Sequence, residues 1–192
     1  LFKSSKEEKL ITLKEYVDRV AEGQDSIYYA TGETVDKING LPQVEAIQSK
    51  GYEILYLTEN VDEFALQVMQ EYQGKKFKNV CADNIDVGTN EEKEALKKLN
   101  EDSKEMLNTM KEALQNEVQD VKFTNRLTKH PVCLTTEGAI SVEMQKVINA
   151  LPNNQTIQAK TLLEINENHP IAQKLKELFN SDKEELKKYT KI

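Results

Sequence analysis

The chain has 192 residues, of which 38% are hydrophobic and 31% are charged, and its formal net charge at pH 7 is −7. This length suits one large domain or two small ones. The negative charge argues against nucleic acids and anionic membranes as partners, and no apolar run approaches the roughly 20 residues that a membrane span needs.

Three helical patterns lie in the first 82 residues. The predicted helices cover residues 12–23, 34–51 and 61–74, and each ends at a glycine. The first and third helices open with the spacing of a capping box, formed by Thr12 with Glu15 and by Asn60 with Glu63. We expect the second helix to be interrupted near Pro42, which cannot donate a backbone hydrogen bond.

Strand patterns alternate with these helices. Apolar, aromatic and β-branched residues predict strands at residues 25–32, 52–58 and 75–81. Strands that are separated by helices form right-handed βαβ units with a parallel sheet. We therefore expect residues 1–82 to form a small α/β domain, with a βαβαβ-type parallel sheet of about three strands.

A polar stretch at residues 82–90 marks the expected boundary to a second domain, residues 83–192. Helices are predicted at residues 91–118, 139–151, 169–180 and 182–192, and strands at residues 120–127, 131–136 and 161–166. The first two of these strands are joined by a short connection, so we expect them to pair as an antiparallel hairpin. Ser181 and Glu184 predict a capping box for the last helix. The pattern predicts an α+β domain with a long helix, a three-stranded sheet and an amphipathic helix.

The sequence shows no grouping of reactive residues that marks an active site. His130 and Cys133 are three apart in a predicted strand, so their side chains point to opposite faces and suit a shared metal poorly. Gly32 lies between a strand and a helix, but neither the dinucleotide fingerprint nor the Walker spacing surrounds it. Cys81 and Cys133 lack the spacing of a disulfide framework, which predicts reduced thiols in a cytoplasmic protein. We expect no enzyme activity, metal or cofactor in this stretch.

One helical pattern carries a distinct apolar stripe. Ile140, Met144, Val147, Ile148 and Leu151 recur at the spacing of one helix face. Such a stripe packs into a core more often than it binds a partner. Two features favour exposure: the flanking segments are polar, and methionine suits adaptable contacts. The pattern alone leaves both alternatives open.

Four blocks of the sequence resemble the heat-shock protein 90 family of chaperones, and its bacterial branch HtpG in particular. These blocks are EGQDSIYYATGE, KGYEILYLTENVDEFALQVMQEYQGKKF, DVKFTNRLTKHPVCL and LLEINENHPIAQKLKEL. They occur in the family's order and lie within residues 22–178. The resemblance implies that residues 1–82 form the small α/β/α end of the family's middle domain. It implies that residues 83–192 belong to the C-terminal dimerisation domain.

The resemblance also implies a function. The family uses ATP and Mg²⁺ to bind and remodel partly folded client proteins, and it acts as a homodimer in the stress response. Its nucleotide site and catalytic arginine precede the stretch that this sequence matches, so we expect no ATP binding or hydrolysis here. The family's dimer helices continue beyond the matched stretch, which predicts weak or absent dimerisation for these 192 residues.

The client-binding residues implied by the resemblance lie in two places. Ile140, Met144, Val147 and Ile148 match positions on an exposed amphipathic helix of the C-terminal domain, where the family often has methionine and phenylalanine. Phe64 matches a position that is often tryptophan in the family. These differences keep the surface apolar but reduce its aromatic content.

Two other hypotheses remain. The first is a small-molecule-binding α/β domain of a cytosolic enzyme, with its ligand near Thr31, Gly32 and Thr58, where predicted strands end. The second is a structural spacer in which every apolar stripe is buried. Bound nucleotide or phosphate would favour the first, and exposed apolar surface would argue against the second.

Overall fold

The protein consists of two compact units in a computed structural model. Residues 1–59, 61–82, 85, 89–115, 117–138, 140–152 and 156–191 are described. The first unit comprises Leu1–Ile85 and Gly138–Ala159, and the second comprises Asp86–Glu137 and Lys160–Ile192. The segment 138–159 therefore groups with the first unit, although the sequence assigns it to the domain 83–192. That domain assignment itself stays a prediction, because contacts alone do not show which pieces fold independently.

The first unit is built on a five-stranded sheet. In sheet order its strands are β1 (Lys3–Ser4), β3 (Ile54–Leu57), β2 (Ser26–Thr31), β5 (Lys75–Asn79) and β4 (Glu71–Tyr72). The three central strands are parallel, as predicted, and the two short edge strands are antiparallel to their neighbours. The sheet is thus the expected βαβαβ arrangement with an extra strand at each edge.

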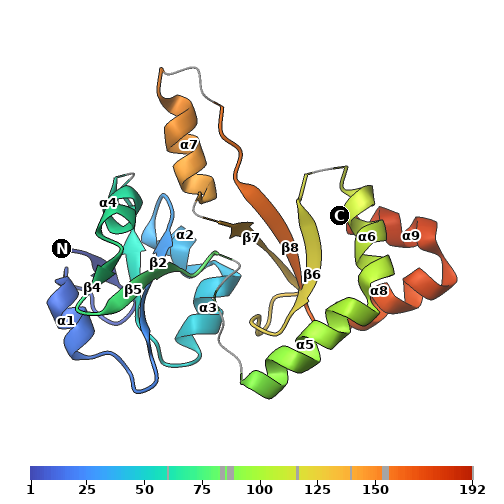
Figure 1. The fold of residues 1–192 in the computed structure, drawn as a ribbon, viewed down its shortest axis with the longest axis horizontal. Coiled ribbons are helices and arrows are strands. Elements are labelled where there is room, and N and C mark those ends of the chain that lie inside the picture. The colour runs from blue at the N-terminus through green and yellow to red at the C-terminus, as the bar shows by residue number, and fades with distance from the viewer. Residues whose placement is uncertain are drawn as a thin grey trace. The chain divides into compact units, whose positions relative to one another are not determined.

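Among the described residues, five helices belong to this unit. They are α1 (Leu13–Asp18), α2 (Val35–Asn39), α3 (Pro42–Gln48), α4 (Asp62–Met69) and α7 (Val142–Ala150). The chain steps from β2 to β3 in one direction and from β3 to β5 in the other. Right-handed crossovers then place α2 and α3 on one face of the sheet and α4 on the opposite face, as Figure 1 shows. Because β2 and β3 are parallel, their C-terminal ends lie at the same edge of the sheet.

One core cluster of this unit lies between the sheet and the helices α1 and α4. Tyr16 of α1 and Leu66 of α4 pack against Ile27, Tyr29 and Leu55 of the two middle strands. The Tyr16 hydroxyl donates to the Glu53 carbonyl oxygen at 2.6 Å, and it accepts from the Tyr28 amide at 3.1 Å. This hydroxyl therefore satisfies buried backbone groups beside β2 and β3.

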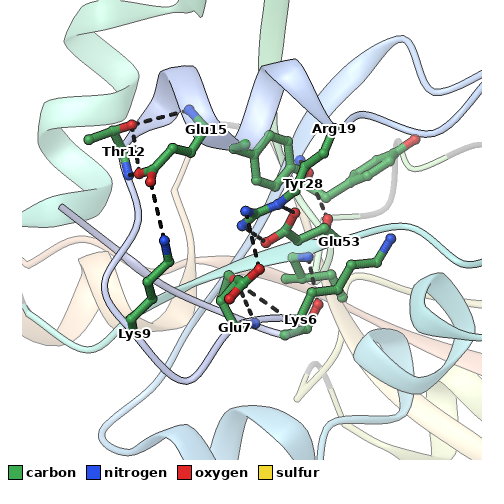
Figure 2. Close-up of polar contacts among 12 residues, drawn as sticks. Lys6, Glu7, Lys9, Thr12, Glu15, Arg19, Tyr28 and Glu53 are labelled. Atoms are coloured by element: carbon green, nitrogen blue, oxygen red, sulfur yellow. Dashed lines mark hydrogen bonds and ion pairs between the residues drawn. The ribbon is translucent and has the colours of Figure 1, made fainter.

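A cluster of ion pairs fastens α1 and the N-terminal segment to the sheet (Figure 2). Arg19 donates two hydrogen bonds to the buried carboxylate of Glu53, from Nε at 2.8 Å and from Nη2 at 2.7 Å. The same guanidinium lies 3.4 Å from Glu7. Thr12 and Glu15 form the predicted capping box of α1. We interpret this cluster as structural, because the Arg19 guanidinium already forms a two-point hydrogen bond with the Glu53 carboxylate.

The predicted helices of this unit end before their glycines in the structure. The first helix ends at Asp18 rather than at Gly23, because Arg19 is its C-cap. The helix expected at 61–74 stops at Met69, where Gln70 adopts φ 62°, and a short β4–β5 hairpin follows. Asn60 lies outside the described residues, and Glu63 is turned inward rather than serving a cap. The predicted interruption near Pro42 is confirmed, since Pro42 begins α3.

The second unit packs helices on a three-stranded sheet. Its elements are α5 (Asn90–Asp102), α6 (Lys104–Ala113), β6 (Asp120–Thr124), β7 (Val132–Glu137), β8 (Lys160–Asn166), α8 (Pro170–Ser181) and α9 (Lys183–Thr190). Its core joins the two β6 residues Val121 and Phe123 to Ile165 of β8 and to Met110 and Leu175 of the helices. The long helix predicted at 91–118 is divided at Ser103, the residue that interrupts its apolar side.

The predicted hairpin of the second unit is wrong. The strand order is β6–β8–β7, so β8 lies between the two strands that were expected to pair. β8 is parallel to β6 and antiparallel to β7. The side chain of Asn166, at the end of β8, donates to the carbonyl oxygens of Thr128 and His130. These bonds hold the segment between β6 and β7 across the end of β8. β8 can therefore lie between these two strands.

The last predicted capping box is also wrong. Ser181 is the final residue of α8, and its hydroxyl donates to the Glu177 carbonyl oxygen. Asp182 caps α9 instead, because its carboxylate accepts from the amides of Glu184 and Glu185 at 3.0 Å. The expected α/β unit and α+β unit are nevertheless both present, so the predicted fold class is confirmed. Across the described ranges, we find no helix with the length and apolar character of a membrane span.

Candidate functional site

The apolar stripe of the sequence lies on α7, which is attached to the first unit by polar contacts. Ser141 is the N-cap of α7, and its hydroxyl accepts from the Met144 amide at 3.1 Å. The same hydroxyl donates to Oε2 of Glu63 at 2.5 Å. One turn further along α4, the Gln67 amide nitrogen lies 3.0 Å from the sulfur of Met144. Two side chains of α4 therefore contact the first turn of α7. Figure 1 shows the ribbons of these two helices next to each other.

Glu63 is the centre of this attachment. Its carboxylate is buried, and Oε1 accepts from Asn79 at 2.8 Å and from the Tyr29 hydroxyl at 3.3 Å. Burial raises the pKa of Glu63 above its usual value, and the hydrogen bonds from Ser141, Asn79 and Tyr29 oppose that rise. Three elements of the α/β unit thus converge on one buried acidic group that holds the start of α7.

The stripe is graded from buried to exposed. Met144 is only 6% exposed, whereas Ile140, Val147 and Ile148 are half-buried. Leu151, at the far end of the stripe, is 53% exposed. The stripe is therefore neither a closed core face nor a free surface: Met144 seats the helix, and its neighbours keep part of their apolar area open.

Phe64 lies close to this stripe. It is half-buried on α4, and it shares a helix face with Gln67, the residue that contacts Met144. The structure thus places the five predicted client-binding residues in one unit: Phe64 on α4, three residues on α7, and Ile140 just before the N-cap of α7. Their role in client binding stays a prediction.

A small recess opens where β2 and β3 end. Thr31 is the last residue of β2, Gly32 follows it, Thr58 follows β3, and Met144 and Val147 of α7 close the other side. Gly32 is required at this position, because a Cβ there would lie 2.8 Å from a side-chain carbon of Ile38. α7 therefore lies at the edge of the parallel sheet where ligands of open α/β folds bind.

The recess is lined by four carboxylates, and this disfavours an anionic ligand. They belong to Glu33, Glu59, Glu63 and Glu143. The nearby N-terminus of α2 is also occupied, since Thr34 accepts from the Lys37 amide at 3.2 Å. A nucleotide or phosphate would meet like charges and a capped helix. The hypothesis of a small-molecule site near Thr31, Gly32 and Thr58 is not favoured.

The histidines and cysteines do not assemble into a site in the described part of the chain. His169 caps α8, where its Nδ1 accepts from the Ile171 amide at 3.2 Å. Cys133 is buried in β7, and Cys81 is half-buried after β5. Within the described ranges, we find no group of three or more histidine, cysteine, aspartate or glutamate residues that could hold a metal ion.

Comparison with known proteins assigns the chain to a family. The family model described as "Hsp90 protein" matches residues 1–192. The chain belongs to the heat-shock protein 90 family. It is similar over all 192 residues to proteins named chaperone protein HtpG, with 46% identity in Clostridium botulinum (strain Langeland), 44% in Bacillus subtilis (strain 168) and 47% in Alkaliphilus metalliredigens (strain QYMF). It spans 31% of the length of each of these relatives.

Membership of the heat-shock protein 90 family confirms the resemblance seen in the four sequence blocks. The contacts that hold α7 were not predicted from those blocks. The spacing from Asn60 predicts a helix cap for Glu63, and no motif at Ser141 or Asn79 indicates a contact with its carboxylate. The only local signal was Ser141 itself, a good N-cap residue just before the stripe. Nothing near residue 63 indicates that its carboxylate reaches residue 141.

Proposed function

We propose that this chain binds partly folded client proteins through an apolar surface on α4 and α7. This client surface consists of Phe64, Ile140, Met144, Val147 and Ile148. The observation that carries the proposal is the way α7 is held: contacts of Ser141 and Gln67 fix the helix, while three residues of its stripe are only half-buried. A helix attached in this way keeps apolar area available to a partner.

The energetics favour contact with unfolded segments. Covering one large apolar side chain contributes about 1.5–3 kcal/mol relative to leaving it exposed. A half-buried side chain offers only part of this free energy. Several such side chains must therefore act together to offset the free-energy cost of association. Met144 is already covered and supports the surface from beneath. Phe64, Val147 and Ile148 would make the direct contacts. A folded client hides its own apolar residues, which gives a preference for partly folded ones.

We further propose that the chain is part of a longer, ATP-driven chaperone of the cytoplasm that acts as a homodimer in the stress response. ATP and Mg²⁺ would bind elsewhere in that protein. The carboxylates of the recess are consistent with this division, because they repel phosphate. Neither nucleic acid nor a membrane surface suits a chain of net charge −7 as a partner.

The test replaces Phe64, Val147 and Ile148 by serine together. Binding to reduced, carboxymethylated α-lactalbumin, a permanently unfolded client, is followed beside thermal unfolding. We expect affinity to fall at least about tenfold, because each change removes apolar area from the contact. The melting temperature should fall by about 6–12 °C, because each of the three half-buried side chains loses packing worth about 1 kcal/mol.

Leu10→Ser with Tyr189→Ser is the matched control, because both side chains are about half exposed and neither residue belongs to α4 or α7. This variant should bind the client like the wild type. Unchanged client binding by a folded triple variant would contradict the proposal. If the triple variant unfolds, the single change Val147→Ser separates lost binding from lost structure.

A further inference from the structure

The outward side of α4 is apolar, which is the reverse of an ordinary surface helix. Val61 is 70% exposed, Val68 is 84% exposed and Met69 is 46% exposed. Together with the exposed Ala65, these residues recur at steps of four, three and one, so they share one face of the helix. The side that faces the protein instead buries Leu66 and the carboxylate of Glu63.

This outward side continues the client surface. Phe64 lies four residues before Val68, and a helix places such residues one above the other. Exposed apolar residues that occur singly need no explanation, but a contiguous face marks an interaction site. A helix face that contacts only water has no need of valine or methionine at these positions. The face is therefore an unassigned surface of the first unit.

The side chains at the start of this face are acidic, although the N-terminal ammonium group also acts on the carboxylate of Asp62. Glu59 and Asp62 lie at the N-terminal end of α4, and α4 itself carries no lysine or arginine. The lysines nearest the adjoining recess are already paired: Lys37 with Glu33, and Lys146 with Glu143 at 2.8 Å. Neither Glu59 nor Asp62 forms an ion pair with a lysine or arginine in the described residues. Burial raises the pKa of Asp62, and the nearby Glu59 adds to that rise.

We propose that the outward side of α4 selects client segments in which apolar residues stand next to lysine or arginine. Val61, Val68 and Met69 would cover the apolar residues, and Glu59 and Asp62 would meet the basic ones. The proposal deepens the client-binding function and rests on it. A second copy of this chain, with its net charge of −7, would be repelled by the same carboxylates.

The test uses two fluorescent peptides with one apolar core of alternating leucine and valine. One peptide has two lysines at each end, and the other has two glutamates. We expect the wild-type chain to bind the lysine peptide about tenfold more tightly at low salt, and the difference to shrink at high salt, where exposed charges are screened. Equal affinities at low salt would overturn the proposed selection.

Two double variants separate the apolar and the charged contribution. Val61→Ser with Val68→Ser should weaken both peptides at least about tenfold without loss of folding, because both side chains are largely exposed. Glu59→Gln with Asp62→Asn should remove the preference for lysine while leaving the glutamate peptide bound. Leu10→Ser and Glu22→Gln, which alter exposed residues elsewhere in the unit, are the matched controls.

The outcomes distinguish this inference from the proposed function. If Val61→Ser with Val68→Ser leaves peptide binding intact while the Phe64, Val147 and Ile148 variant abolishes it, the inference fails and the client surface stands. If the wild-type chain binds neither peptide nor the unfolded client, the proposed function itself fails. Should the serine variant unfold, Val68→Thr keeps the shape of the side chain, and a loss of binding there would still support the inference.

Discussion

Glu63 shows how one residue joins two distant parts of the chain. A glutamate at the third position after Asn60 has the spacing of a capping box, and the sequence offers no other use for it. In the structure its carboxylate is buried and accepts from Tyr29, Asn79 and Ser141. Local spacing could not predict this, because 78 residues separate Glu63 from Ser141.

The raised pKa of Glu63 predicts a pH dependence of stability. A carboxyl group whose pKa is raised by folding contributes stability that is present below its unfolded pKa, near 4.5, and is lost as pH rises through the folded pKa. Glu63→Gln cannot titrate. The free energy of unfolding of the wild type should therefore fall relative to this variant as pH rises above about 4.5. Urea unfolding of both proteins from pH 4 to pH 8 measures the difference.

Glu15 provides a control of opposite sign. Hydrogen bonds from the amide and the hydroxyl of Thr12 lower the pKa of Glu15. Its stabilising contribution is present above the unfolded pKa and is lost as pH falls. The wild type should therefore gain stability relative to Glu15→Gln as pH rises. The same sign for both variants would contradict the account of Glu63.

At the scale of helices and strands, the sequence predicts the features that depend on neighbouring residues, such as helix caps and helix interruptions. The capping box at Thr12 and the interruption at Pro42 are confirmed, because cap bonds and a missing amide act within a few residues. The partner of a strand is not local. The alternating pattern around Val121 shows which side chains face the core, but it would suit any neighbouring strand. The insertion of β8 between β6 and β7 therefore could not be predicted.

The attachment of α7 makes a prediction for this helix. Ser141→Ala removes the N-cap bond to the Met144 amide and one donor to the buried Glu63 carboxylate. We expect a loss of about 1–3 kcal/mol in stability, and faster amide hydrogen exchange in α7 than in α1. Ser181→Ala is the matched control. Ser181 caps no helix, so its replacement should leave stability and exchange nearly unchanged.

Equal effects of the two serine changes would show that Ser141 does not hold α7. The hydrogen-exchange measurement separates a local loosening of α7 from a general loss of stability. A general effect would speed exchange in β2 and β3 as much as in α7.

At the scale of the whole molecule, the family could be identified from the sequence, whereas the position of the stripe could not. The four blocks that resemble heat-shock protein 90 chaperones lie in order along the chain, and the family match covers all 192 residues. The pattern of the stripe left burial and exposure open. Its grouping with the first unit depends on contacts of Glu63 and Gln67 that no periodicity encodes.

The most direct test of the client surface is methyl NMR of the 22.0 kDa chain as an unfolded client is added. The account predicts that the methyl signals of Val147, Ile148 and Ile140 shift or broaden first. The methyl signal of Ile165, buried in the second unit, should remain unchanged. Client-induced changes confined to the exposed residues Val132 and Leu134 of β7, with none on α7, would contradict the account.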